Sequence, residues 1–272
     1  MARLETAKAL AFLARDFREA ASYKFAFVVS FLDVLVSSTV FYFIARLVPA
    51  GEATSLAPYG GDYYGFVIIG ISFSGMLGLF QEALPGIVRG AQTAGTLECL
   101  LATPTRMSTI LFGSSLYPFL WSSFRILVQI LFAALAFGLR FGRILWPGAA
   151  LVFILTSLCT IGIGFWSASF ILVYKKGNPF GWLIGMATGV FGGVFFPVAV
   201  LPSFLRWISP FLPATHALEG MRRSLLASSS FAEVLPSLKA LALFTLILVP
   251  SGLWIFRLAL HKAKRDGTLT HF

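Results

Sequence analysis

The sequence predicts an all-α integral membrane protein with six transmembrane helices. Of its 272 residues, 58% are hydrophobic and only 12% are charged, whereas soluble domains carry about 25% charged residues. Six apolar runs each approach or exceed the roughly 20 helical residues that cross a bilayer core. Basic residues flank these runs, and a backbone surrounded by lipid favours helices because a helix satisfies its own hydrogen bonds.

The N-terminal stretch, residues 3–22, has the pattern of an amphipathic helix. Its apolar residues share one face at about 100° per residue: Leu10, Leu13, Ala14, Phe17 and Ala21. Phe12 breaks this pattern. We expect the helix to lie in the membrane interface, and the alternative is a plain cytoplasmic tail. Charges of both signs and the lack of an apolar core argue against a cleavable signal peptide here.

The whole chain, 1–272, is expected to form one transmembrane domain. The predicted spans are residues 25–47, 63–80, 110–139, 147–174, 179–201 and 236–256. The predicted organisation is an interfacial helix at 1–24, spans one and two at 25–80, a cytoplasmic segment at 81–107, spans three to five at 108–201, an outer segment at 202–235, and the last span with a basic tail at 236–272. An even number of spans places both termini on one side. Most basic residues fall on that side, which predicts cytoplasmic termini, although Arg140 and Arg143 run against the rule.

The cytoplasmic segment contains a short amphipathic pattern of its own. Three leucines lie on one helical face: Leu97, Leu100 and Leu101. Glu98 lies off that face, Thr93 or Thr96 suits the N-cap, and Pro104 ends the helix. Such a helix is suited to meeting another protein, and the alternative is an ordinary polar loop.

Two further patterns occur in and after the fifth predicted span. Glycine recurs at every fourth residue, which lines one helical face with small residues: Gly181, Gly185, Gly189 and Gly193. This face would pack against a second subunit or against another helix of the same bundle.

The outer segment is too polar to span the membrane and is punctuated by proline, at Pro197, Pro202, Pro210 and Pro213. We expect two short helices that enter the outer leaflet and return, and the alternative is a loop on the surface. Glu219 is spaced to pair with Arg222 or Arg223 along one helix.

Ionisable residues inside two spans need polar partners or water. A charge near the centre of a membrane helix costs about 2.5 to 3.5 kcal/mol on insertion scales. Asp33 and Arg125 therefore predict a polar site inside the bundle, with Gln129 one turn beyond Arg125. The alternatives are that the long third span tilts so that Arg125 snorkels to the membrane surface, or that Asp33 lies near the interface.

Motifs for catalysis, metal binding and nucleotide binding are missing from the sequence. There is no phosphate-binding loop, no His-Glu-x-x-His, no Cys-x-x-Cys and no Gly-x-Ser-x-Gly. Cys99 and Cys159 lie far apart, so no disulfide is expected. The net charge of +10 does not form a basic patch with interleaved aromatics, which argues against nucleic acid as a partner. Any energy source for this protein must come from elsewhere.

The order of these features resembles the membrane subunit of a type-2 ABC exporter over essentially the whole chain. The similarity rests on the run Gly-Thr-Leu-Glu-Cys-Leu-Leu-Ala-Thr-Pro-Thr at residues 95–105, placed between spans two and three. The Phe-Phe-Pro run at residues 195–197 and the prolines after it add to the likeness. The outer arginines Arg140 and Arg143 depart from the expected pattern and put the ends of spans three and four in question.

The resemblance implies a partner and a set of roles. The short cytoplasmic helix would be a coupling helix that contacts a separate ATP-binding subunit through Thr96, Leu97, Glu98, Leu100 and Leu101. MgATP would bind that subunit, so this chain would need no cofactor and would not itself be an enzyme. A second permease, identical or related, would pair through the first and fifth spans. The proline-rich segment, with Glu219 and Arg222, would form the outer gate. The expected location is the cytoplasmic membrane of a prokaryote.

The cargo is the least determined feature. The resemblance suggests export of an amphiphilic or lipid-like molecule, and a polysaccharide or lipid-linked glycan is the alternative. A secondary transporter would be expected to show an internal repeat and broken helices, and the two halves of the chain do not look alike. An integral-membrane enzyme would need several convergent acidic or histidine residues at one depth, which Asp33 alone does not supply.

Overall fold

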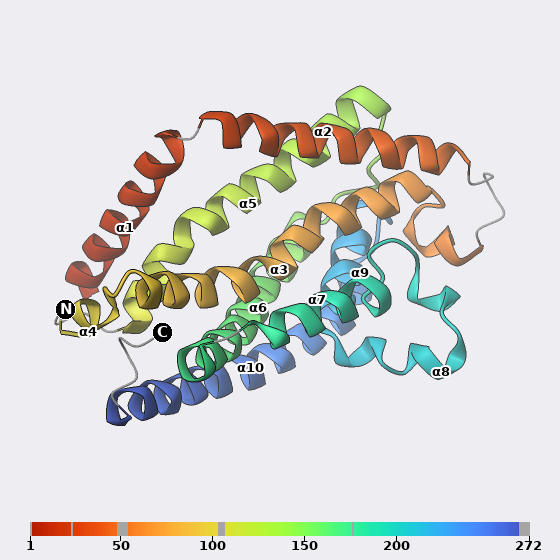
Figure 1. Ribbon diagram of the computed structural model, residues 1–272. Helices are drawn as coiled ribbons and strands as arrows, with labels where there is room; N and C mark the ends of the chain where they lie inside the picture. The colour runs from red at the N-terminus through yellow and green to blue at the C-terminus, as the bar shows by residue number, and fades with distance from the viewer. Residues whose placement is uncertain (1, 23, 48–53, 103–106, 176, 267–272) are drawn as a thin grey trace.

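The computed structural model describes residues 2–22, 24–47, 54–102, 107–175 and 177–266, and these ranges contain helices and turns but no strand. The long helices are α1 (Ala2–Ser22), α2 (Lys24–Arg46), α3 (Tyr63–Thr93), α5 (Met107–Phe137), α6 (Trp146–Tyr174) and α10 (Phe231–Arg265). The shorter helices are α4 (Leu97–Ala102), α7 (Pro179–Phe191), α8 (Ser203–Arg206) and α9 (Pro213–Leu225), and the 3-10 turns are η1 (Thr54–Tyr59), η2 (Val198–Val200) and η3 (Ser209–Phe211). The beginning of α1 and the end of α10 lie at the same end of the bundle (Figure 1).

Five helices in the described ranges are long and apolar enough to cross a membrane. They are Val28–Arg46 within α2, Tyr63–Thr93, Thr109–Phe137 within α5, Trp146–Tyr174 and Phe231–Arg265. They match the first four predicted spans and the sixth. The second span is longer than predicted, because α3 continues to Thr93 rather than ending near residue 80. The segment predicted as cytoplasmic therefore begins as a continuation of a membrane helix.

The fifth predicted span is not one continuous helix, and that part of the six-helix prediction is wrong. The helix α7 has 13 residues, or about 20 Å at 1.5 Å per residue, which is less than the roughly 30 Å of a bilayer core. It ends at Phe191, and Gly193 then adopts a left-handed backbone with φ of 79°. The following residues, up to the start of α9 at Pro213, contain only the short elements η2, α8 and η3.

The chain nevertheless changes ends of the bundle between α6 and α9. At the start of α7, the side chain of Asn178 donates a hydrogen bond to the carbonyl of Gln81, midway along α3 (2.7 Å). At the other end, the carbonyl of Val194 lies so close to Gly70 that a Cβ there would be 2.1 Å from the oxygen. The segment therefore runs antiparallel to α3, from Gln81 back to Gly70.

The helices α3 and α6 form the centre of the bundle. Within the most apolar stretch of each helix, 67% of α3 and 56% of α6 is buried, compared with 11% for α2, 17% for α5 and 22% for α10. A close crossing holds α6 against α10, because a Cβ on Gly162 would lie 2.6 Å from the backbone of Leu248. Small residues permit this approach in the absence of a hydrophobic driving force between membrane helices. The outer helices expose most of their apolar surface to lipid or to another subunit.

The helix α1, which is predicted to lie in the membrane interface, presents two apolar faces instead of one. Phe12, which breaks the predicted pattern, packs against the hydrophobic core near the end of α3. On the predicted apolar face, Leu10 is 62% exposed and Phe17 is 63% exposed, although the ring of Phe17 still meets Tyr117 of α5 edge to face. The helix is thus attached to the bundle on one side and keeps an apolar strip available for the membrane interface.

Candidate functional site

An ion pair joins α2 to α5 within the apolar bundle. The Nη2 atom of Arg125 lies 2.7 Å from Oδ2 of Asp33, and the two side chains are 39% and 64% exposed. The structure therefore brings together the two charged residues that the sequence places inside spans. The pair lies at the edge of the bundle and not deep inside it. Mutual neutralisation reduces the cost of holding these charges among apolar helices.

A second polar contact follows one helical turn along α5. Gln129 is 5% exposed, and its Nε2 atom donates a hydrogen bond to the hydroxyl of Ser37 on α2 (3.3 Å). Ser72, on the facing side of α3, is also 5% exposed, and its buried hydroxyl has no hydrogen-bond partner within the described ranges. Three helices thus contribute polar atoms at one level.

These polar groups surround a cavity of about 330 Å³. Its lining includes the charged pair, Gln129 and five hydroxyl or small residues: Ser37, Ser72, Ser74, Gly75 and Ser122. Buried polar groups are expensive in a membrane helix and are usually retained for a function. We refer to this cavity as the polar groove.

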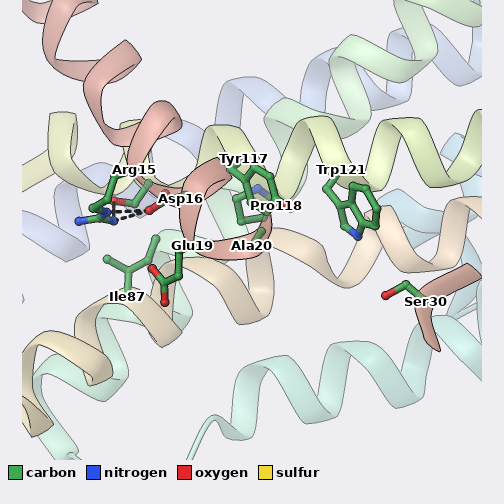
Figure 2. Close-up of a pocket in the computed structure, with 10 residues that line it drawn as sticks. Arg15, Asp16, Glu19, Ala20, Ser30, Ile87, Tyr117, Pro118 and Trp121 are labelled. Atoms are coloured by element: carbon green, nitrogen blue, oxygen red, sulfur yellow. Dashed lines mark hydrogen bonds and ion pairs between the residues drawn. The ribbon is translucent and has the colours of Figure 1, made fainter. Parts of the chain in front are cut away.

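A second cavity, of about 460 Å³, lies next to the polar groove and beneath α1. The two cavities share Pro118 and Trp121 of α5, so they follow one another along that helix. Figure 2 shows the charged α1 residues Arg15, Asp16 and Glu19 at one end of the second cavity, and Trp121 with Ser30 toward the other end. We refer to it as the α1 cavity.

The charges of the α1 cavity are held by local contacts. Arg15 pairs with Asp16 (2.7 Å), reaches the hydroxyl of Ser114 on α5 (3.5 Å) and lies over the ring of Phe12 at 5.1 Å. The cavity therefore offers positive charge, negative charge and aromatic surface. This combination suits a molecule with a polar head and an apolar body.

The predicted coupling helix is present as α4, and one of its residues has a different role from the predicted one. Gly95 turns the chain with φ of 66°, and the carbonyl of Thr96 accepts the first helical bond from Leu100 (3.0 Å). Leu97 is 0% exposed and packs in the core beside the end of α3. Its side chain anchors α4 and offers no surface to a partner, which corrects the predicted contact role. The side chains of Glu98 and Leu101 lie outside the described residues.

The glycine stripe extends over three residues of α7 and not four, because Gly193 lies beyond the helix. Gly185 and Gly189 line a crevice of about 200 Å³ together with Ser74, Gly78 and other residues. These glycines therefore face α3. The exposed surface of α7 carries larger residues instead: Trp182, Leu183, Met186 and Val190.

The end of the fold opposite the termini is organised around Arg222 of α9, which is 3% exposed. Its guanidinium donates hydrogen bonds to the carbonyls of Gly193 (2.7 Å), Val194 (3.0 Å) and Phe66 (3.1 Å). It also lies 3.4 Å from the centre of the Phe66 ring. Burial lowers the pKa of Arg222 to about 9, so it remains protonated at neutral pH. The carbonyls freed by the break after α7 thereby find a donor.

Glu219 pairs with Arg223 (2.6 Å) and not with Arg222, which decides between the two predicted pairings. Its second carboxylate oxygen accepts a hydrogen bond from the hydroxyl of Tyr59 in η1. The four prolines lie at element boundaries: Pro197 precedes η2, Pro202 precedes α8, Pro210 lies in η3 and Pro213 begins α9. The insertion of these short elements into a membrane leaflet stays a prediction.

Three residues of these sites were not singled out from the sequence. Ser37 lies one helical turn beyond Asp33, so the shared helical face was a usable signal. Ser72 is one of many hydroxyl residues in apolar runs, and nothing in the local pattern marks it. Tyr59 lies in a turn segment, and its bond to Glu219 depends on tertiary structure alone.

The fold and the polar groove define a helical, multi-pass membrane protein with polar and charged groups where its transmembrane helices meet, as in membrane transporters. The chain belongs to the ABC-2 family of transporter proteins, because the model of that family matches residues 44–254. The match includes Arg125 and Gln129 but begins after Asp33. The chain is also similar to the linearmycin resistance permease protein LnrN of Bacillus subtilis, with 27% identity over 175 residues. That alignment covers 63% of this chain and 44% of the relative, so it spans less than half of the relative's length.

Proposed function

We propose that this chain is the permease subunit of an ATP-driven exporter that moves an amphiphilic or lipid-like molecule out of the cytoplasm. The observation that carries the proposal is the pair of adjoining cavities along α5. One holds charges of both signs beneath α1, and the other holds the Asp33–Arg125 pair at the edge of the bundle. Family membership and the similarity to a relative named as a resistance permease support the transport role.

ATP hydrolysis is assigned to a separate subunit. The sequence contains no phosphate-binding loop, and α4 offers a docking point at the cytoplasmic end of α3. Because Leu97 is fixed in the core, displacement of α4 would be passed to α3. That helix is 31 residues long, or about 46 Å, and Phe66 near its other end contacts Arg222. A single rigid element thus links the ATPase side to the outer segment.

We assign the interface with a second permease to the exposed sides of α2 and α7. Trp182 and Met186 are 68% and 56% exposed, and α2 is the least buried of the spanning helices. Exposed apolar residues on these helices can face lipid as well as protein. Pairing of two copies would enclose the polar groove between subunits and give its charges a watery path. Both termini are assigned to the cytoplasmic side of the inner membrane.

The test is ATP-dependent transport in inside-out proteoliposomes that contain this chain and its candidate ATP-binding subunit. The probe is a fluorescent phospholipid, and a fluorescent oligosaccharide tests the glycan alternative. The variants are Asp33→Ala with Arg125→Ala, and the matched control is Ser251→Ala on the exposed side of α10. We expect the wild type and the control to move the phospholipid and the double variant to lose most transport while keeping its fold. No movement of either probe by a wild-type complex that hydrolyses ATP would overturn the proposed cargo, and full transport by the double variant would overturn the route.

A further inference from the structure

A concave site lies at the end of the bundle opposite the termini, and nothing in the proposed transport route uses it. Its volume is about 680 Å³, and its walls come from the end of α2, the η1–α3 turn, the end of α5 and the loop after α5. The polar residues that line it are Tyr42, Arg46, Tyr59, Asp62, Tyr64 and Arg140. Two of them are arginines on the side where the positive-inside rule predicts few.

The guanidinium of Arg46 is held in place by its neighbour. Both Nε and Nη2 of Arg46 donate to the hydroxyl of Tyr42 (3.2 and 2.6 Å). The Tyr42 ring is itself fixed, because it stacks on Phe137 with 4.5 Å between ring centres. Arg46 is therefore oriented by a packed aromatic pair.

The loop that carries Arg140 is also fixed. It is tied to the segment after α9 by three hydrogen bonds: Gly142 N–H to Leu225 O (3.1 Å), Arg143 N–H to Ser228 Oγ (2.6 Å) and Leu145 N–H to Ser224 O (2.8 Å). A Cβ on Gly142 would lie 2.4 Å from the carbonyl oxygen of Leu226. The backbone thus reaches this position only because residue 142 is glycine, and the site is built from packed elements.

The acidic residue at the site is engaged elsewhere. Both oxygens of Asp62 cap α3 by accepting from the N–H groups of Tyr64 (3.0 Å) and Gly65 (3.1 Å). A carboxylate in this position is directed at the positive end of the helix dipole. Because Asp62 caps α3, the guanidinium groups of Arg46 and Arg140 are the charged groups that the cavity offers to a ligand.

The position of the cavity at the ends of two apolar stretches favours a lipid headgroup as its ligand. Arg46 is the last residue of the apolar stretch Val28–Arg46, and the cavity also includes Phe137, the last residue of the apolar stretch Thr109–Phe137. Both ends place the cavity at the boundary between hydrocarbon and water, where phospholipid phosphates lie, and tyrosines are typical of this level. Arginine pairs readily with phosphate oxygens through its planar set of donors.

We propose that this cavity binds a phosphate-bearing anion, presented by the headgroup of an anionic phospholipid, with Arg46 and Arg140 as the cationic ligands and Tyr42 as a positioning residue. The proposal is independent of the cargo and of the ATP-binding subunit. A soluble phosphate would satisfy the same groups, and the test separates the two sources.

The experiment uses the full chain in nanodiscs that contain phosphatidylglycerol and phosphatidylcholine, followed by native mass spectrometry of the lipids retained. The variants are Arg46→Gln and Arg140→Gln, singly and together. The matched control is Arg143→Gln, which lies in the same loop, is exposed and does not line the cavity. Each variant in the cavity is expected to weaken phosphatidylglycerol retention about tenfold, and the control is expected to behave as the wild type. Tyr42→Phe keeps the ring but removes the hydroxyl, and should weaken retention by a smaller factor.

Equilibrium dialysis with inorganic phosphate tests the second source. Phosphate binding that is lost in the double variant, without preference for phosphatidylglycerol over phosphatidylcholine, would support the anion site and overturn the lipid as its ligand. Equal loss of lipid in the Arg143→Gln control would show that overall surface charge is responsible and would overturn the site. Unchanged retention of lipid and phosphate in the double variant would do the same.

Discussion

Replacing Arg222 by Met should destabilise the outer half of the fold strongly. Methionine keeps most of the apolar volume but removes all three hydrogen bonds to the carbonyls of Gly193, Val194 and Phe66. The first two carbonyls follow the end of α7 and have no helical partner there, and a buried unpaired group costs about 1–3 kcal/mol. The variant no longer has to bury a guanidinium, which stabilises its folded state. It also loses the hydrogen bond to the Phe66 carbonyl and the contact with the Phe66 ring, which destabilises that state. We expect a net loss of about 4 kcal/mol, within the roughly 2–6 kcal/mol that two unpaired buried carbonyls would cost.

The matched control for this prediction is Arg223→Met at the next position. Arg223 is about one-third exposed in its pair with Glu219, and such pairs contribute about 0–1 kcal/mol. The assay is thermal unfolding of both purified variants in the same detergent. For a chain of this size, each kcal/mol corresponds to roughly 2–4 °C in Tm, so we expect a drop of about 10 °C for Arg222→Met and about 3 °C or less for the control. Arg222→Lys should lie between them, because one ammonium cannot reproduce the planar set of donors. Equal melting of Arg222→Met and Arg223→Met would refute the reasoning.

Two other substitutions test the helix contacts. Gly70→Ala should lower the Tm and disturb the segment after α7, because its Cβ would lie 2.1 Å from the Val194 carbonyl oxygen, whereas Gly75→Ala on the same helix meets nothing within 4 Å and should be neutral or slightly stabilising. A Tm for Gly70→Ala equal to that for Gly75→Ala would contradict the close approach. Leu97→Ala should cost about 2–5 kcal/mol, as for other fully buried leucines, and should reduce ATPase stimulation when the ATP-binding subunit is added. Leu246→Ala, at an exposed leucine of α10, should change neither property, and normal stimulation of a destabilised Leu97→Ala variant would separate the anchor from coupling.

The polar groove shows how far sequence reasoning reaches in a membrane protein. The cost of charge in lipid predicts that Asp33 and Arg125 need polar partners or water, but that the two pair with each other is a finding of the structure. Ser37 shares a helical face with Asp33 and could have been included, whereas the contribution of Ser72 could not be foreseen, because it depends on the rotation of α3 about its own axis. That rotation is set by packing and leaves no trace in local composition.

The fifth span shows the opposite case, in which a correct local signal led to an incorrect element. Its residues are apolar enough to span and its glycines keep helical spacing, so a continuous helix was the reasonable prediction. The break at Gly193 becomes affordable only because Arg222, 29 residues later, supplies hydrogen bonds to the freed carbonyls. A long-range partner of this kind is invisible to any short window of sequence.

The sequence by itself determined the membrane class, the five long spans, the short helix between the second and third spans and the charged residues that needed polar partners. These properties follow from hydrophobicity, helical periodicity and the cost of burying charge, all of which act locally along the chain. Only the tertiary structure decided that Arg222 holds backbone carbonyls while Arg223 pairs with Glu219, that Phe12 packs inward, and that Arg46 and Arg140 meet at one cavity. These outcomes depend on which helix faces meet, and contacts between residues distant in sequence fix that choice.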